Sequence, residues 1–302
     1  MPPPESPLVL AIFGPTGIGK TALAFAFAAR LREAGERPVA VSADALQVYQ
    51  GLETLTGVPT PDERARLEHR LVSFLPVDAR FSVGEYAALA HAEIDGLLAA
   101  GARPIVGGGT GLYLRAALTE LALRPPPPDE LRGRLERELV ERGPEALHAR
   151  LARLAPWAAE GIDPRDRSRV VRSLELLELG ELEPPQGPNQ LWTAETRHPT
   201  RLIGLVMDRE VLYRRIDERV DAMVAAGAVD EVRAAHAAGA SETARKALGF
   251  DDLLRGDVDA MKRRTRNLAK RQLTWMRKLA GVEVVDVTGR HPGEVARALL
   301  DA

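Results

Sequence analysis

Short apolar runs alternate with segments of helical spacing along the first part of the chain. The runs hold four to six mostly apolar residues, and glycine, aspartate or serine stands at or just beyond their ends. Such runs are typical of buried parallel strands joined by helices. We expect strands at 8–13, 38–42 and 103–106, and helices at 21–31, 83–100 and just after the third strand. The pattern predicts an α/β fold whose parallel sheet has helices on both faces.

The pattern changes near residue 119. Residues 130–179 are rich in leucine, arginine and glutamate, with helical spacing and no strand pattern. Strand-like runs then return at 202–207 and 282–287, with helical segments at 208–227, 261–278 and 292–300. An insertion into the sheet domain explains this order economically. We therefore predict an α/β core formed by residues 1–118 and 199–302, with a helical subdomain at 119–198 inserted into it.

Composition excludes several classes of protein. The chain has 302 residues, 45% of them apolar, which is enough for a sizeable core. It has no cysteine, which excludes disulfides and thiolate metal sites. No apolar run approaches the length of a membrane span, and the N-terminus lacks the basic region of a signal peptide. We expect a cytoplasmic protein without membrane contact, and a monomer.

The segment GPTGIGKT, which follows the first predicted strand, fits the phosphate-binding P-loop pattern G-x-x-x-x-G-K-[ST]. Backbone N–H groups of such a loop and the N-terminus of the next helix attract phosphate oxygens. The lysine adds a charge, and the hydroxyl of Thr21 can reach Mg²⁺. A strand–helix turn without a ligand is the alternative. The segment predicts a P-loop NTPase-like core that binds phosphate through Gly14, Pro15, Thr16, Gly17, Ile18, Gly19, Lys20 and Thr21.

Two further strand ends carry residues suited to chemistry. Asp44 follows the second predicted strand, where a carboxylate would face the ligand crevice of an open α/β sheet. An aspartate there also suits a turn or a helix N-cap. The third strand runs into four glycines and Thr110 within 107–111, which permit close approach of a ligand. Thr110 is a candidate for a hydrogen bond to phosphate.

Positive charge is concentrated in one helical segment, and a second one carries a pair of arginines on one face. Residues 261–278 hold eight lysines and arginines and no acid, in a chain whose net charge is −2. A basic helix that carries an aromatic residue suits a nucleic-acid backbone, although a solvated helix offset by acidic neighbours has the same pattern. Arg215 and Arg219 lie one turn apart in the 208–227 helix. They form either surface ion pairs or a diphosphate clamp.

The chain resembles the tRNA dimethylallyltransferase family. The matching segments are GPTGIGKTALA, VSADALQVYQG, RPIVGGGTGLYLRAAL, the stretch from Asp166 to Arg169, RKALGF and TRNLAKRQLTWMRK. They follow one another in the family's order and span nearly the whole chain. The resemblance implies transfer of a dimethylallyl group from dimethylallyl diphosphate to N6 of adenosine 37, next to the anticodon of tRNA, with Mg²⁺ as cofactor.

The same resemblance assigns roles to individual residues. It implies that Asp44 is the catalytic carboxylate, assisted by Lys20, Thr110 and Arg219. The tRNA-binding residues that it implies are Asp44, Ala45, Leu46, Gln47, Thr110, Asp166, Arg169, Arg245, Gly249, Lys270, Arg271, Gln272, Trp275 and Arg277. The helical insert at 119–198 is expected to contribute to tRNA binding.

The sequence departs from the family's pattern at a few positions. Ala45 replaces a small polar residue, and Arg165 replaces an asparagine. The 55–59 loop, LTGVP, lacks the usual lysine, so the resemblance implies no lysine contact between this loop and tRNA. Three alternative functions stay open. They are prenyl transfer to free AMP, ADP or ATP, a small-molecule kinase with a P-loop, and a non-catalytic RNA-binding protein.

Overall fold

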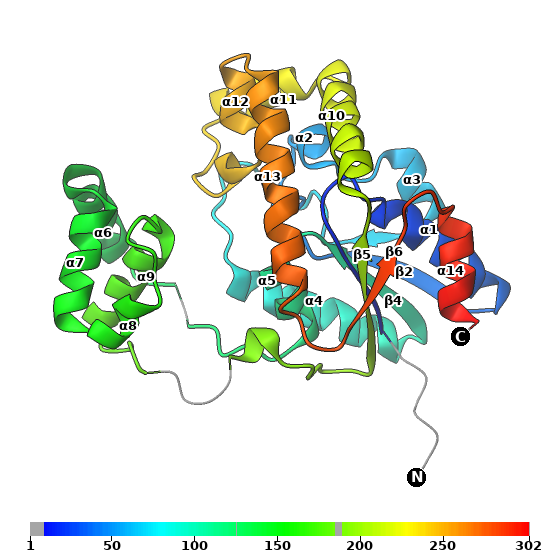
Figure 1. The fold of residues 1–302 in the computed structure, drawn as a ribbon, viewed down its shortest axis with the longest axis horizontal. Helices are drawn as coiled ribbons and strands as arrows, with labels where there is room; N and C mark the ends of the chain where they lie inside the picture. The colour runs from blue at the N-terminus through cyan, green and yellow to red at the C-terminus, as the bar shows by residue number, and fades with distance from the viewer. Residues whose placement is uncertain (1–8, 125, 185–188, 302) are drawn as a thin grey trace, which may run out of the picture. The chain divides into compact units, whose positions relative to one another are not determined.

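A parallel sheet forms the centre of the larger of two compact units in the computed structural model, which describes residues 9–124, 126–184 and 189–301. This unit joins the N- and C-terminal parts of the chain (Figure 1). Within the described residues six strands pair in the order β3-β2-β4-β1-β5-β6, all parallel. They are β1 Val9–Phe13, β2 Arg37–Ser42, β3 His69–Arg70, β4 Ala102–Gly108, β5 Thr200–Val206 and β6 Val282–Asp286.

Both faces of the central strands are buried, because their alternate residues enter different cores. Leu10 and Ile12 of β1 pack into one hydrophobic cluster, whereas Val9, Ala11 and Phe13 pack into the other. A strand that is buried on both faces must be apolar throughout, so the continuous apolar run reflects its central position. The predicted α/β fold class is confirmed. The predicted first strand began at Leu8, which lies outside the described residues.

Helices from distant parts of the sequence cover the two faces. One cluster takes apolar side chains from the helices at 20–33, 209–225 and 292–300, and the other takes them from those at 83–99, 111–118, 228–237, 250–254 and 258–276. The helices of this unit are α1 Lys20–Glu33, α2 Glu53–Thr56, α3 Pro61–Arg66, α4 Val83–Ala99, α5 Gly111–Leu118, α10 Arg209–Ala225, α11 Ala228–Ala237, α12 Phe250–Leu254, α13 Val258–Met276 and α14 Pro292–Leu300. Short 3₁₀ turns occur at Gln190–Trp192 and Ala244–Lys246.

Strand order places three chemically distinctive loops at one edge of the sheet. β1 pairs with β4 on one side and with β5 on the other, and β2 pairs with β4. In a parallel sheet all carboxyl ends lie at the same edge, and a crevice opens where connections from adjacent strands diverge. The loops that follow β1, β2 and β4 therefore converge there. They carry the P-loop, Asp44 and Thr110.

The second unit is a helical domain with its own core. It extends over Arg124–Asn189 and contains α6 Asp129–Arg142, α7 Pro144–Leu154, α8 Pro156–Glu160 and α9 Arg167–Glu178. Leu135, Leu151 and Leu174 are fully buried in this core. Glu175 is 0% exposed and its carboxylate accepts hydrogen bonds from Arg132 and Arg172.

The boundaries of this unit lie inside the range of 119–198 expected from the sequence. The returning segment is fixed to the sheet unit by Arg115, which is 1% exposed and donates to the backbone oxygens of Gln190 and Glu195. Arg197 adds a bidentate pair with Asp95, at 2.9 and 3.1 Å.

The sequence pattern made no prediction for α11 or for β3. No helix of the described residues has the length and apolarity of a membrane span.

Candidate active site

The P-loop leaves the buried end of β1 and enters α1 at Lys20. Gly17 and Gly19 have φ angles of +78° and +104°, in the left-handed region where a side chain is strained. These conformations turn the chain within a few residues from strand to helix. The first N–H groups of α1 have no partner within the helix, so they are available to an anion. The local backbone is therefore that of a phosphate-binding loop.

Lys20 folds back over this loop. Its ammonium donates to the carbonyl oxygens of Gly14 at 2.9 Å and Pro15 at 3.1 Å. Burial lowers the pKa of Lys20 to about 8, partly offset by the attraction of Asp44 and reinforced by the repulsion of Arg219. The ammonium is therefore held in a poorly solvated site, where a bound anion would gain strong electrostatic stabilisation.

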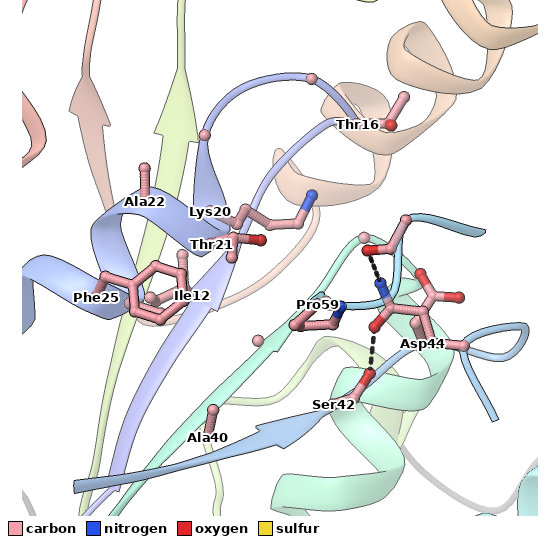
Figure 2. A pocket seen from close by; sticks show the side chains of 18 of the residues that line it. Ile12, Thr16, Lys20, Thr21, Ala22, Phe25, Ala40, Ser42, Asp44 and Pro59 are labelled. Carbon is pink, nitrogen blue, oxygen red and sulfur yellow. Dashed lines mark hydrogen bonds between the residues drawn. The ribbon is translucent and has the colours of Figure 1, made fainter. Parts of the chain in front are cut away.

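Asp44 lies on the other wall of the same cavity. One carboxylate oxygen accepts the backbone N–H of Leu46 at 3.0 Å, so the side chain also fixes its own turn. Figure 2 shows the Lys20 side chain extended across the pocket, with Asp44 on the opposite side. The acid thus serves the turn, as the structural alternative predicted, and still faces the space beyond the P-loop.

One cavity of about 1420 Å³ joins these groups. The side chains of Thr16, Thr21 and Thr110 also line it. Thr110 is the N-cap of α5 but forms no capping hydrogen bond through its side chain, so its hydroxyl is free of that role. Predicted site residues that line the cavity are Thr16, Gly17, Gly19, Lys20, Thr21, Asp44, Leu46, Gln47, Thr110, Arg219, Arg271 and Gln272.

The glycines at the end of β4 and just beyond it allow close packing of protein neighbours, and three of them also line the cavity. A Cβ atom on Gly108 would collide with the carbonyl group of Ala43, and one on Gly111 would collide with the ring of Trp275. A Cβ on Gly107 would meet nothing within 4 Å, and this residue lines the cavity. Gly108 and Gly109 also line the cavity, so close approach of a ligand to this run stays a prediction. Most of them let β2, β4 and α13 pack closely.

Gln47 supports the Asp44 turn from within the protein. Its carbonyl oxygen accepts the hydroxyl of Ser42 at 2.7 Å, and its NH₂ group donates to the backbone oxygens of Thr56 and Gly57 (Figure 2 draws the bond from Ser42). Both polar atoms of the side chain are thus bonded internally. Glu231 anchors the same loop by accepting the N–H groups of two α2 residues, at 2.8 and 2.9 Å.

Arg219 faces this loop from α10. Its guanidinium lies where a Cβ atom on Gly57 would stand, so a side chain at position 57 would displace it. The guanidinium is open to the cavity. The surrounding protein nevertheless removes enough water to lower the pKa of Arg219, and the attraction of Asp44 offsets part of this decrease. Arg215 also lines the cavity, one turn earlier and close to Gly19. Two arginines and Lys20 thus place three cations around the P-loop.

The basic segment is one helix, α13, whose charges divide into two groups. Arg266 pairs with Asp217 and Lys262 pairs with Asp221 at 2.6 Å, so these cations hold α13 to α10. Lys270, Arg271 and Arg277 have exposed side chains. The alternative of acidic neighbours is therefore realised in the first half of the helix. The predicted RNA contacts are in the second half.

Two predicted RNA contacts of α13 point inward instead. Gln272 is 8% exposed and bonded to two loops of the site. Trp275 is only partly exposed, and its ring centroid lies 4.5 Å from that of Trp192 and 6.5 Å from that of Phe13. Trp275 thus packs against protein, whereas Gln272 is bonded to protein and also lines the cavity. Direct contact of either side chain with RNA stays a prediction.

The remaining predicted contacts have identifiable structural roles. Gly249 has φ +95°, and a Cβ there would lie 2.6 Å from the sulfur of Met261. Arg245 pairs with Asp251 at 3.0 Å. In the helical unit, Asp166 caps α9 by accepting the N–H of Arg169, whose side chain is 70% exposed.

Sequence reasoning missed several residues of the cavity wall. Ile12, Phe25, Ala40 and Pro59 give it an apolar side between α1 and the loop after β2 (Figure 2). In the sequence the first three look like ordinary core positions. They are distinguished by lying on the same cavity as the P-loop, and this proximity can be seen only in the folded structure.

Comparison with known protein families identifies relatives. A family model described as IPP transferase matches residues 47–279, and one described as isopentenyl transferase matches residues 7–77. The tRNA dimethylallyltransferase of Thermobifida fusca is 43% identical over 283 residues, covering 89% of this chain and 87% of the relative. That of Symbiobacterium thermophilum is 41% identical over 294 residues, covering 94% and 90%.

Solved structures agree with this assignment. A full-length tRNA isopentenylpyrophosphate transferase from Bacillus halodurans superimposes with a TM-score of 0.68 at 31% identity, covering 97% of this chain and 95% of that one. A eukaryotic dimethylallyltransferase acting on tRNA has a TM-score of 0.74 at 21% identity, covering 97% and 78%, which is a likeness of fold alone. Because the first family model spans most of the sequence and the relatives align along nearly their whole length, the chain belongs to the IPP transferase family.

Proposed function

We propose that the protein transfers a dimethylallyl group from dimethylallyl diphosphate to N6 of adenosine 37 of tRNA. The observation that carries this proposal is the single cavity shared by a phosphate-binding loop and a carboxylate. Lys20 and Asp44 interact electrostatically across that cavity. Cleavage of a diphosphate ester and deprotonation of an amine need these two groups in one place.

The P-loop side would receive the leaving group. As the bond between C1 and oxygen breaks, its electron pair departs with the diphosphate, and negative charge grows on those oxygens. Loop N–H groups, Lys20 and Arg219 are placed to stabilise this charge in a poorly hydrated site. The apolar wall formed by Ile12, Ala40 and Pro59 suits the five-carbon group.

The Asp44 side would receive the adenine. The exocyclic amine is a weak nucleophile because its lone pair is delocalised into the ring. As N6 bonds to C1, it loses one proton, which the carboxylate of Asp44 accepts. The base must leave its stack to reach this position. Thr110, also on the wall, is placed to orient either the base or the departing diphosphate.

Mg²⁺ fits the groups present. Thr21 offers a hydroxyl at the start of α1, and the described residues contain no cluster of three or more acidic or histidine side chains that would form a metal cage. Mg²⁺ typically keeps water ligands and binds through substrate phosphates with few protein groups. When bound, the ion would neutralise diphosphate charge. Thr21 would hold the ion together with the diphosphate of the substrate.

RNA would be held by exposed cations. Lys270 and Arg271 on α13 and Arg277 at its C-cap are open to solvent, and Arg271 also lines the cavity. Arg169 is the corresponding exposed cation among the predicted contacts of the helical unit. Such residues bind phosphates and release counterions, giving affinity that falls with salt.

We also propose that the protein acts as a monomer, which sedimentation velocity would test.

The deciding experiment is mass spectrometry of nucleosides from tRNA incubated with the protein, dimethylallyl diphosphate and Mg²⁺. The expected product is N6-dimethylallyladenosine together with free diphosphate. Parallel reactions with AMP, ADP and ATP as acceptors test the mononucleotide alternative. Phosphate transfer from ATP to small molecules tests the kinase alternative. Absence of prenylated nucleoside in tRNA, with product in either parallel reaction, would overturn the proposal.

A further inference from the structure

Gln272 connects the basic helix to two loops of the active site. Its side-chain carbonyl oxygen accepts the backbone N–H of Thr16 in the P-loop at 2.9 Å. Its NH₂ group donates to the backbone oxygen of Gly109, in the glycine run after β4, at 2.8 Å. A Cβ atom on Gly109 would lie 2.4 Å from this amide if nothing moved, so glycine is needed for the approach.

This bonding fixes the orientation of the amide. One partner is a donor and the other is an acceptor, so a single orientation of the carbonyl and NH₂ groups satisfies both. Glutamate offers no donor to Gly109, and methionine offers a similar length without either polar group. Glutamine is thus the side chain of this length that can bridge an N–H group and a carbonyl oxygen here.

The surrounding residues make α13 two-sided at this point. Trp275 fixes the inner face one turn later, against Gly111 and Phe13. Lys270 and Arg271, immediately before Gln272 in the sequence, are exposed. The same turn of helix therefore carries cations outward and a buried amide inward. Any shift of this turn must move the Thr16 amide or break its hydrogen bond.

We propose that Gln272 is a positioning residue that couples RNA binding on α13 to donor binding at the P-loop. The inference rests on the proposed function, because RNA is the expected ligand of the exposed cations. RNA bound to Lys270 and Arg271 restrains α13. The amide of Gln272 in turn restrains Thr16 and Gly109. The diphosphate then binds to a P-loop that is better ordered. By linkage, diphosphate must strengthen RNA binding by the same factor.

The test measures binding of inorganic diphosphate with Mg²⁺ by calorimetry, with and without a tRNA anticodon stem-loop. Wild-type protein is compared with Gln272→Met, which removes both hydrogen bonds, and with Gln272→Glu, which keeps only the acceptor for Thr16. Gln50→Met is the matched control, because Gln50 is an exposed glutamine whose amide donates to a loop carbonyl. Thermal unfolding confirms that each variant is folded.

The stem-loop should tighten diphosphate binding to the wild type about tenfold, within the usual range of allosteric coupling. Gln272→Met should lose most of this factor, and Gln50→Met should keep it. RNA affinity without diphosphate should be unchanged in Gln272→Met. Gln272→Glu should keep part of the coupling, and it replaces the methionine variant if that one fails to fold.

Two results would overturn the inference. One is equal diphosphate affinity of the wild type with and without RNA. The other is unchanged coupling in Gln272→Met, and a simultaneous loss of RNA affinity would make the residue an RNA contact. Both are binding measurements, so they remain distinct from failure of the proposed reaction, which would show as missing prenylated nucleoside.

Discussion

Lys20 shows how burial changes the pKa of a residue that the P-loop motif already identifies in the sequence. In water a lysine side chain keeps its proton throughout the physiological range, but desolvation in the cavity lowers its pKa to about 8. A lysine so placed is charged below that pH and becomes neutral above it. Bound diphosphate would favour the charged form and draw the pKa back up.

The reaction with dimethylallyl diphosphate should therefore become less efficient in alkaline solution. The kcat/KM for dimethylallyl diphosphate reports groups of the free enzyme, so it should decline as the pH rises through about 8 and Lys20 loses its proton. Steady-state rates between about pH 6.5 and 9.5 measure this. In Lys20→Arg the guanidinium stays charged, so the alkaline decline should move upward even though activity is low. An unmoved decline would assign it to another group.

Asp44 has a structural and a proposed chemical role that one substitution separates. The side chain introduced by Asp44→Asn keeps an oxygen for the Leu46 N–H group but cannot accept a proton from N6. The kcat of prenyl transfer should fall about 10²- to 10⁴-fold, the usual contribution of a general base. RNA affinity, measured by fluorescence anisotropy, should stay nearly unchanged. An equal loss of affinity and rate would argue against the chemical role.

At the scale of elements, α13 shows why a charge pattern alone does not define a binding surface. Two of its cations pair with Asp217 and Asp221 of α10, whereas Lys270 and Arg271 are exposed. The two groups lie on one continuous basic sequence. Only the packing of α10 against α13 tells them apart.

Removal of exposed charge should change the salt dependence of RNA binding. Replacing Lys270 and Arg271 with glutamine should reduce the slope of log K against log salt by about 0.7–0.9 for each lost phosphate contact. Arg266→Gln is the control, because its partner is Asp217 and its loss should lower stability without changing the slope. Binding titrations from about 50 to about 300 mM salt measure both. Equal slopes in all three proteins would place the RNA surface elsewhere.

At the scale of the whole molecule, the chain forms two units with separate cores. The helical unit encloses the buried carboxylate of Glu175 between Arg132 and Arg172. Buried ion pairs contribute little net stability, but loss of one partner leaves a charge without compensation. Because these arginines are partly exposed, the cost of that loss should be smaller than for fully buried charges.

Glu175→Ala should therefore weaken the helical unit selectively. We expect a loss of about 2 kcal/mol in the free energy of unfolding of that unit. Hydrogen exchange should accelerate in residues 126–184 and stay unchanged in the sheet unit. Glu145→Gln is the matched control, since Glu145 is exposed and its contact with Arg165 spans 3.6 Å. Faster exchange in both units would show that their stabilities are coupled.

Much of the fold was predictable because its main elements have strong local patterns. The apolar runs of β1, β2, β4 and β5 and the spacing of α4 and α13 could be located within one to three residues. β3 was not predictable, because it has two residues and exists only by pairing with β2. α11 has ten residues, and its buried face consists of Ala228, Val232 and Ala235, so two of the three buried side chains are small and mark the helix weakly in the sequence.

The sequence by itself determined the P-loop, the acid after β2 and the basic helix, because each is written in consecutive residues. Only the tertiary structure decided that Lys20 and Asp44 share a cavity. It likewise decided that Gln47 and Gln272 serve neighbouring loops and which cations of α13 are neutralised. The physical reason is that burial and hydrogen-bond partners depend on segments far apart in the sequence, such as Thr16 and Gln272, which are bonded across 256 positions.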